Sequence, residues 1–208
     1  MMMKYPYASY EGAINDGACD RIISHGIDKV SEATVRDDSQ RDIRKSKTAW
    51  LTDQWLYDLI SPYMLAANRD TGWNYEFDLF EPMQFTVYEP GGHYGWHADC
   101  GTDIHCAYTD ETTSDGKMVG KVRKLSMTLN LTDPDTYTDG DLQFDTPAAT
   151  ITNSTRDEDG VRFWSGQPDC RERGTIVVFP SYMSHQVTPV TSGTRYSLVV
   201  WALGKPFR

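Results

Sequence analysis

The chain of 208 residues is long enough for one well-filled hydrophobic core and short for two independent folding units, so we expect a single domain over residues 1–208. A hydrophobic share of 39% and an aromatic share of 12% are typical of a folded globular protein and exclude a largely disordered chain. The formal net charge of -10 argues against a nucleic-acid partner, because binding to phosphates depends on Lys and Arg. The basic clusters at residues 36–47 and 117–124 are expected to be solvated faces.

The N-terminal segment and the cysteines bear on the expected location of the protein. Residues 5–10 lack the uninterrupted apolar stretch of a secretory signal, and no run of the sequence approaches membrane-spanning length. The 4 cysteines form no C-x-x-C pair, which argues against a zinc ribbon and against a dense disulfide framework. A reducing compartment is the simpler interpretation, so we expect a cytoplasmic protein with no membrane partner. The sequence leaves the oligomeric state open.

Two helices are predicted in the N-terminal third of the chain. In residues 16–30 apolar side chains recur at spacings typical of an amphipathic helix, which Asn15 or Asp16 is expected to start. A second helix is predicted over residues 52–68, where Pro62 is a candidate kink or break. We expect these helices, within about residues 1–75, to flank and support a sheet.

From Asn74 onward the sequence changes to short runs of β-branched and aromatic residues separated by Gly, Pro, Asp and Asn, which is typical of strands. Strands are predicted at residues 85–88, 124–131, 142–144, 175–179, 185–189 and 195–203. This pattern favours a mainly β sandwich or jelly roll over about residues 76–208, whose funnel-shaped interior can hold a small ligand. Two long polar segments, 101–121 and 145–173, are predicted to be lids or disordered.

His97 and Asp99 form a candidate metal site. They are separated by one residue, so in an extended backbone both side chains project to the same side. With a second histidine they would form the two-histidine, one-carboxylate face that suits non-haem iron(II) and leaves coordination positions open. We predict that His185 is this third ligand. The H-x-D pair alone is a weak signal, because it also occurs by chance as a loop histidine beside a solvated aspartate.

The surroundings of these residues strengthen the prediction. A strand ending at Tyr88 is followed by a glycine turn at residues 91–92, which can aim His97 inward. Residues 174–180 have the pattern of a buried strand, and they place His185 at the mouth of the β funnel.

An arginine on the last predicted strand offers a site for an anion. Alternation puts four side chains on one face of that strand: Arg195, Ser197, Val199 and Trp201. A guanidinium matches a carboxylate in a two-pronged, charge-assisted pair. The distal carboxylate of a 2-oxo acid would satisfy Arg195, while its other end occupies two metal positions and leaves the last for dioxygen. The alternative is a salt bridge from Arg195 to one of the acids of the chain.

Several motifs together resemble the 2-oxoglutarate oxygenases of the prolyl 4-hydroxylase group, over residues 44–201. The motifs with the same order and spacing are Arg44-x-Ser46 with Trp50-Leu51, and Tyr88-x-x-Gly91-Gly92-x-Tyr94-x-x-His97-x-Asp99. Residues 123–130 resemble the next core strand, and residues 139–142 resemble the Gly-Gly-x-Leu turn, with Asp139 in place of the first glycine. His185-x-Val and Arg195-Tyr196-x-x-x-x-Trp201 are most similar to the oxygen-sensing prolyl hydroxylases and a bacterial branch.

The resemblance implies a double-stranded β-helix core, iron(II) at His97, Asp99 and His185, and 2-oxoglutarate anchored by Arg195. It further implies co-substrate contacts at Tyr88, Thr128, Ser197 and Trp201, with Thr128 at the position of a tyrosine in the oxygen-sensing enzymes. Ascorbate is an additional cofactor expected from the family. The implied reaction is hydroxylation of a prolyl residue in a peptide or protein, with release of succinate and carbon dioxide.

Two residues and two alternatives concern the substrate. His93 and Trp164 are predicted to face the substrate, Trp164 from the second polar segment. The same chemistry could act on a free amino acid, another side chain or a small metabolite, and a closed pocket rather than an open groove would favour a metabolite. A third hypothesis is a non-enzymatic jelly-roll module in which the histidines and Arg195 satisfy internal polar contacts.

Overall fold

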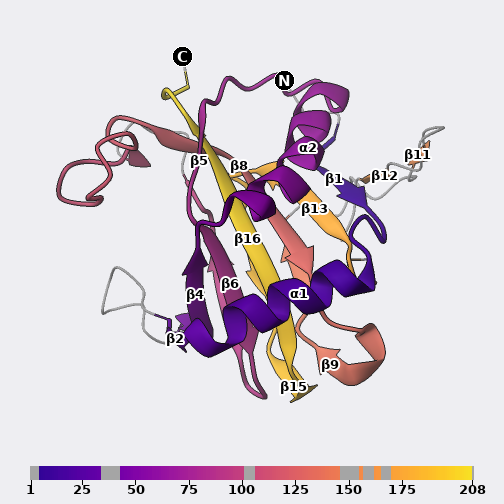
Figure 1. The fold of residues 1–208 in the computed structure, drawn as a ribbon. Coiled ribbons are helices and arrows are strands. Elements are labelled where there is room, and N and C mark those ends of the chain that lie inside the picture. The colour runs from indigo at the N-terminus through magenta and orange to yellow at the C-terminus, as the bar shows by residue number, and fades with distance from the viewer. Residues whose placement is uncertain are drawn as a thin grey trace.

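The structure, a computed structural model, describes residues 5–33, 43–100, 106–145, 155–156, 162–164 and 170–207. These residues form α-helices and antiparallel strands (Figure 1). The helices are α1 (Asp16–Gly26) and α2 (Gln54–Asp70), with 3-10 turns η1 (Ile27–Lys29) and η4 (Pro134–Thr136). The strands are β1 (Tyr7–Tyr10), β2 (Ser31–Glu32), β3 (Arg44–Lys45), β4 (Lys47–Leu51), β5 (Leu79–Phe80), β6 (Met83–Tyr88), β7 (His93–His97), β8 (Val122–Asn130), β9 (Tyr137–Asp139), β10 (Leu142–Phe144), β11 (Thr155–Arg156), β12 (Arg162–Trp164), β13 (Ile176–Pro180), β14 (His185–Val187), β15 (Val190–Gly193) and β16 (Arg195–Gly204).

The two larger sheets form a jelly roll, and β9 and β15 pair as a separate two-stranded sheet. The large sheet has the strand order β11-β12-β1-β13-β8-β16-β6-β4-β2, with β5 beside β16, and the small sheet has the order β10-β14-β7-β3. Residues of both sheets line a common cavity, so the small sheet lies over one face of the large one. Figure 1 shows α1 crossing the other face, in front of β4, β6 and β16. The structure thus has the predicted mainly β fold with a jelly-roll core and flanking helices.

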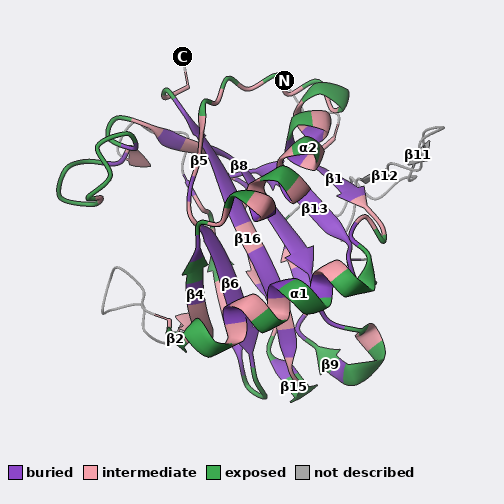
Figure 2. Ribbon diagram, in the orientation of Figure 1, coloured by how far each residue is buried: buried purple, intermediate pink, exposed green. Residues whose placement is uncertain are grey.

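Helix α1 packs against the sheet through a very close approach. Its N-cap is Asn15, whose side-chain oxygen accepts a hydrogen bond from the backbone N–H of Ala18 at 2.9 Å. At the other end, a Cβ on Gly26 would lie 2.6 Å from the ring of Phe85 on β6. Only glycine therefore lets the helix end sit directly on that ring. Figure 2 shows the consequence, with buried strands behind a helix whose outer side is exposed.

Helix α2 continues through Pro62, so the predicted split does not occur there. Pro62 lies on the exposed side of the helix, where water can satisfy the carbonyl group that loses its N–H partner. The opposite side is buried against the sheet through Leu56, Ile60, Met64 and Ala67. Packing of that apolar side outweighs the local cost of proline.

The N-terminal third is not helical alone, because it also supplies strands to both sheets. β1 pairs with β13 and β12, and β4 pairs with β6, so both extend the large sheet. β3 pairs with β7 and forms one edge of the small sheet. These strands were not predicted from the sequence, and the helical support expected within about residues 1–75 is therefore a mixture of helices and strands.

The two predicted lids are described in part. Within the first, residues 106–121 form a loop closed by backbone hydrogen bonds between Tyr108 and Lys121 and between Gly120 and Tyr108. Tyr108 and Met118 pack on Trp201, so this loop lies beside the cavity. Most of the second lid, 145–173, lies outside the described residues, apart from its two ends and the short strands β11 and β12.

Two of the cysteines form a disulfide that the sequence analysis did not foresee. Cys100 and Cys106 are joined, with their Cα atoms 5.8 Å apart, directly after the predicted metal ligand Asp99. Cys19 and Cys170 are buried and lie outside this bridge. One bridge is not the dense framework that was argued against, and the cytoplasmic location stays a prediction.

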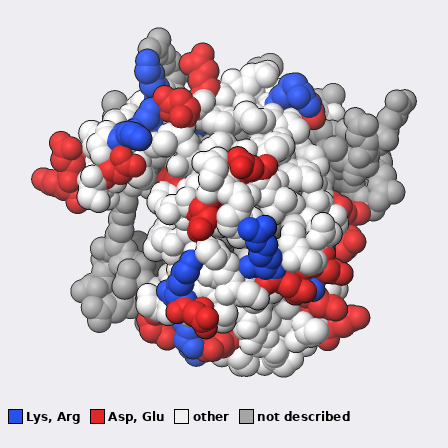
Figure 3. Space-filling model, viewed as in Figure 1, with Lys and Arg blue, Asp and Glu red and all other residues white. Residues whose placement is uncertain are grey.

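The distribution of surface charge and the hydropathy of the helices are relevant to binding of nucleic acids and membranes. On the face seen in Figure 3, basic side chains alternate with acidic ones over the coloured surface instead of joining into one stripe. Two surface ion pairs are of this kind: Lys47 lies 2.8 Å from Glu89, and Lys121 lies 2.7 Å from Asp78. Such pairs contribute little stability. Neither of the helices described combines the length and hydropathy that crossing a bilayer requires.

Candidate metal and co-substrate site

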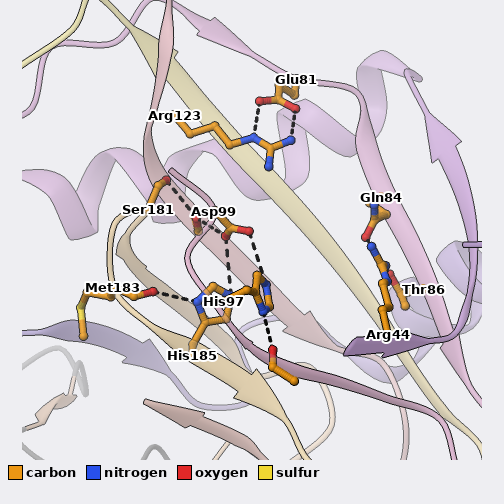
Figure 4. A network of polar contacts seen from close by, with 12 residues as sticks. Arg44, Glu81, Gln84, Thr86, His97, Asp99, Arg123, Ser181, Met183 and His185 are labelled. Atoms are coloured by element: carbon orange, nitrogen blue, oxygen red, sulfur yellow. Dashed lines mark hydrogen bonds and ion pairs between the residues drawn. The ribbon is translucent and has the colours of Figure 1, made fainter. Parts of the chain in front are cut away.

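The three predicted metal ligands converge in the small sheet (Figure 4). His97 ends β7, Asp99 follows two residues later, and His185 begins β14. The two strands pair with His97 directly opposite His185, so the register of the sheet brings both imidazoles together. One ligand atom from each residue lies within 4.8 Å of the others. Across the described residues, no other group of three or more His, Cys, Asp or Glu side chains is arranged to hold a metal ion.

Both imidazoles present Nε2 to the shared centre. The Nδ1 atom of His97 lies 2.8 Å from the carbonyl oxygen of Gly95, and Nδ1 of His185 lies 2.9 Å from that of Met183. A carbonyl oxygen can only accept, so each Nδ1 carries a proton and Nε2 is the atom of each ring left to coordinate a metal. Each Nε2 lies 3.7 Å from a carboxylate oxygen of Asp99. These are the tautomers of metal-binding histidines.

The carboxylate of Asp99 is buried and held by two hydroxyl groups. Ser126 Oγ donates to Asp99 Oδ2 at 2.6 Å, and Ser181 Oγ lies 2.9 Å from Ser126 Oγ. Burial raises the pKa of Asp99, but its interactions with the neighbouring His185 and Arg123 outweigh burial, and the pKa is lowered overall. The group is therefore a carboxylate at neutral pH.

His97 is held in its neutral form. Burial, and next the neighbouring His185, lower the pKa of His97 to about 4. At neutral pH the ring is uncharged, as metal coordination requires. Two imidazoles and one carboxylate, with no thiolate, match the donor set of non-haem iron(II) and leave part of its coordination sphere free.

A cavity adjoins the three predicted ligands between the two sheets. It is lined by Gln84, Tyr88, Tyr94, His97, Asp99, Thr128, Leu142, Phe179, His185, Val187, Arg195, Ser197, Val199 and Trp201. The predicted co-substrate contacts Tyr88, Thr128, Ser197 and Trp201 are all among them. The alternation expected along the last strand is therefore present, because Arg195, Ser197, Val199 and Trp201 all line the cavity together with the three predicted ligands.

Arg195 is a buried cation that faces this cavity without an anion. The residue is 3% exposed, and its NH1 atom has no hydrogen-bond partner. Its guanidinium carbon lies 5.6 Å from the ring centre of Tyr88, the residue directly opposite on β6. Within the described residues no acidic side chain pairs with Arg195, so the expected alternative of an internal salt bridge is not what the structure shows. A buried, partly unsatisfied guanidinium is costly, and a bound carboxylate would remove that cost.

A second arginine, Arg123, is half-buried and stacks on Trp201, which is one of the cavity residues. Its Nε and NH2 atoms both donate to the carboxylate of Glu81 at 2.6 Å (Figure 4). Its guanidinium carbon lies 3.9 Å from the ring centre of Trp201. Tyr108 donates to the same carboxylate at 2.9 Å. The basic run 117–124 is thus not a solvated face throughout, because Lys124 is buried and Arg123 is half-buried and paired with Glu81. Charge clustering gave no signal of this, since the partner Glu81 lies 42 residues away.

Tyr94 and Arg44 were quoted only as parts of a motif, and the structure gives them contacts at the site. The ring of Tyr94 stacks on His97 with ring centres 3.5 Å apart. The guanidinium carbon of Arg44 lies 4.6 Å from the ring centre of Tyr94. Spacing within the motif could have suggested that these residues serve the metal site.

The structure does not confirm either of the two predicted substrate contacts, His93 and Trp164. His93 bonds through Nδ1 to the carbonyl oxygen of Gly91 at 3.0 Å and is not among the residues that line the cavity. The backbone of Trp164 pairs with Tyr7 in the large sheet, but its side chain lies outside the described residues. Both roles stay predictions.

Known proteins share this fold and parts of this sequence. A PKHD-type hydroxylase of Shewanella sp. (strain MR-7) is 32% identical over 122 residues, which cover 59% of this chain and 42% of the length of that relative. A prolyl-4-hydroxylase of Pseudomonas putida has a TM-score of 0.61 at 20% identity, covering 96% of this chain and 93% of its own. A prolyl hydroxylase from Trichoplax adhaerens, in complex with a peptide fragment of the hypoxia inducible factor oxygen degradation domain, has a TM-score of 0.58 at 15% identity, covering 96% and 84%.

The solved structures establish the fold, and the sequence family adds the chemistry. The family model described as 2OG-Fe(II) oxygenase superfamily matches residues 83–203, a stretch that contains all three metal ligands and Arg195. The match covers more than half of the chain, and it includes the cavity strands β6, β8 and β16. The protein therefore belongs to the 2OG-Fe(II) oxygenase superfamily, whose members use iron(II), 2-oxoglutarate and dioxygen.

Proposed function

We propose that this protein hydroxylates a prolyl residue in a peptide or protein and releases succinate and carbon dioxide. The observation that carries the proposal is the pairing of two features in one cavity: three converging metal ligands and, beyond them, an unpaired buried guanidinium. The relatives that it resembles include a PKHD-type hydroxylase and prolyl hydroxylases. The chain matches less than half the length of the PKHD-type relative, so the substrate is argued from the cavity itself.

Each side chain has a defined task in this proposal. Bound iron(II) supplies the activation of dioxygen that couples oxidative decarboxylation of 2-oxoglutarate to hydroxylation of a carbon. His97, Asp99 and His185 hold the metal through two Nε2 atoms and a carboxylate. Arg195 binds the distal carboxylate of 2-oxoglutarate, and this pairing fixes the 2-oxo end toward the metal.

The mouth of the cavity suits a proline side chain. Trp201 is stacked by the guanidinium of Arg123 on one side, and Trp50, which is 52% exposed, lies with its ring centre 6.1 Å from that of Trp201. Trp201 is a cavity residue and Trp50 is exposed, so the pair offers an aromatic surface beside the cavity that can pack against a flat, apolar pyrrolidine ring. Exposure of Trp50 supports a substrate that extends outside the cavity, such as a peptide.

The test of this function uses the iron-loaded protein with 2-oxoglutarate and a set of proline-containing peptides. We expect mass spectrometry to find one added oxygen on a prolyl residue and succinate in equal amount. The matched substrate is the same peptide with alanine in place of proline, which should stay unmodified. Hydroxylation of the alanine peptide at another residue, or of free proline alone, would support the alternatives of another side chain or a small metabolite instead.

The non-enzymatic hypothesis makes the opposite prediction about binding. A jelly-roll module whose histidines and Arg195 only satisfy internal contacts should neither bind a stoichiometric metal ion nor be stabilised by a 2-oxoglutarate analogue. An oxygenase should show both, because a ligand that binds only the folded state raises the unfolding temperature. The unpaired NH1 atom of Arg195 favours the oxygenase.

Ascorbate is proposed as an accessory reductant. It would return to iron(II) any metal that is oxidised when 2-oxoglutarate is consumed without substrate. We expect ascorbate to prolong turnover in the absence of peptide and to change little when peptide is saturating. Progress curves for succinate with and without ascorbate test this.

A further inference from the structure

We propose that Arg44 is a positioning residue for the metal site, which holds Tyr94 flat against His97 and thereby fixes the plane of that imidazole. The inference rests on the proposed metal site at His97, Asp99 and His185. Its first observation is a stack of three groups. The rings of Tyr94 and His97 lie 3.5 Å apart at an interplanar angle of 12°. The guanidinium carbon of Arg44 lies 4.6 Å from the centre of the Tyr94 ring, and it must occupy the other face because His97 fills the first.

The stack exists because of an irregularity in β7. Opposite β14, His97 pairs with His185, but Tyr94 pairs with Val187, so three steps on β7 match two on its partner. A regular strand would turn residues three apart to opposite faces. The extra residue instead brings Tyr94 and His97 to the same side, where both line the cavity.

Arg44 is itself held from two directions. It lies directly opposite Tyr94 in the β3–β7 pair of the small sheet. Its Nε atom donates to Ser46 Oγ at 2.9 Å, and its NH2 atom donates to Gln84 Oε1 of the large sheet at 2.7 Å (Figure 4). Arg44 therefore joins the two sheets, and its guanidinium plane cannot turn away from Tyr94 without breaking these bonds.

Comparison of the three metal ligands shows why this matters. Asp99 is fixed by Ser126, and His185 by the Met183 carbonyl together with the ring of Phe179 at 4.7 Å. His97 has one hydrogen bond, from Nδ1 to Gly95, about which the imidazole can still tilt. The Tyr94 ring removes that freedom, and the contacts that hold metal ligands in place typically contribute roughly ten- to a hundredfold to metal affinity.

The experiment measures binding of Co²⁺, which needs no reductant, and the visible absorption of the Co²⁺-loaded protein. We expect Arg44→Gln to weaken Co²⁺ binding by roughly tenfold and to change the absorption spectrum, as in other proteins that lose such a supporting contact. Tyr94→Leu should cause a similar loss, and the double variant should lose little more, because both changes break one stack. Tyr94→Phe keeps the ring and should restore both the affinity and the spectrum of the wild type.

A control separates this role from plain stabilisation. Arg173→Gln removes a surface arginine that binds Asp20 and the carbonyl oxygen of Leu131, far from the cavity residues, and it should lower thermal stability without changing Co²⁺ affinity. If Arg44→Gln behaves like Arg173→Gln, Arg44 is only structural and the inference is wrong. If Arg44→Gln does not fold, the Tyr94→Leu and Tyr94→Phe pair decides, and equal Co²⁺ affinities of those two variants would overturn it. Failure of the wild type to bind Co²⁺ would remove the proposed function itself.

Discussion

Arg195 carries the largest unresolved energetic cost among single residues at the site. Its guanidinium is buried at 3% exposure and NH1 lacks a partner, while Trp201 Nε1, which also lines the cavity, is unpaired as well. Buried charges without partners destabilise a fold. The empty cavity therefore lowers the stability of the ligand-free protein, and binding of an anionic ligand would remove this cost.

We therefore expect Arg195→Met to raise the thermal stability of the protein free of metal and co-substrate, by about 1–3 kcal/mol. The same variant should lose nearly all affinity for 2-oxoglutarate, because the counter-charge for its distal carboxylate is gone. Unfolding temperatures measured with and without a 2-oxoglutarate analogue check both effects. A variant that is less stable than the wild type when empty, yet still stabilised by the analogue, would show that Arg195 serves the fold instead.

Because the pKa of His97 is lowered in the folded protein, we predict that the free energy of unfolding decreases in mild acid. The ring has a pKa of about 4 when folded, against 6.5 for an ordinary histidine, so the unfolded chain takes up a proton in this interval and the folded chain does not. The metal-free protein should lose up to about 3 kcal/mol of its free energy of unfolding as the pH falls from 6.5 to 4. Urea titrations at several pH values measure this loss.

The matched variant is His97→Gln, which cannot titrate and should flatten the slope between those pH values. Asp99 does not confuse the interval, because its pKa is already lowered and its stabilisation is lost only at more acidic pH. Equal slopes for the two proteins would mean that His97 is not held neutral by burial.

How far single residues could be predicted depends on their distance along the chain. His97, Asp99 and Arg195 were found because alternation on one strand reveals which side chains share a face. Arg123 and Glu81 were missed because their pairing joins different strands, β8 and the segment before β6, and no local period encodes it. The disulfide Cys100–Cys106 was likewise invisible, because the two cysteines form no recognisable motif.

At the scale of elements, the contact between α1 and β6 shows how packing can reverse a local preference. Gly26 lies in α1, where alanine would ordinarily be favoured by about 1 kcal/mol. The ring of Phe85 stands 2.6 Å from the place where a Cβ would lie, so space rather than propensity decides. The helix end and the ring are in direct contact.

Gly26→Ala should therefore destabilise the protein, by about 1–3 kcal/mol, through overpacking against Phe85. Gly17→Ala in the same helix is the matched control, because its Cβ would meet only Asn15 Oδ1 at an ordinary 3.6 Å. It should be neutral or slightly stabilising. Denaturant unfolding of both variants tests the sign, and stabilisation by Gly26→Ala would show that α1 can move off the sheet at no cost.

The elements themselves were only partly predictable. Both helices and the strands β6, β8, β10, β13, β14 and β16 appear where periodicity placed them, within a few residues. β1, β3 and β4 were missed because they are short and gain their stability from neighbours far along the chain. Pro62 was overestimated as a helix breaker because its position on the exposed side of α2 depends on tertiary packing.

At the scale of the whole molecule, the two faces of the large sheet have different roles. The helices bury one face of the large sheet, where Ile22, Leu56 and Ile60 meet Phe85 and Val200 in the main core. The other face, left free for the small sheet, holds the polar side chains that would be costly to bury without a ligand. A single domain over residues 1–208 stays a prediction, which one cooperative unfolding transition would support.

The most direct test of the central claim is an anaerobic titration of the iron(II)-loaded protein with 2-oxoglutarate, followed by the charge-transfer absorption that arises when a 2-oxo acid chelates iron(II). The account predicts a saturable band with one iron per chain in the wild type, no band in His185→Ala, and a much weaker affinity for 2-oxoglutarate in Arg195→Met. A wild-type protein without the band, or an Arg195→Met variant that binds 2-oxoglutarate as tightly as the wild type, would contradict it.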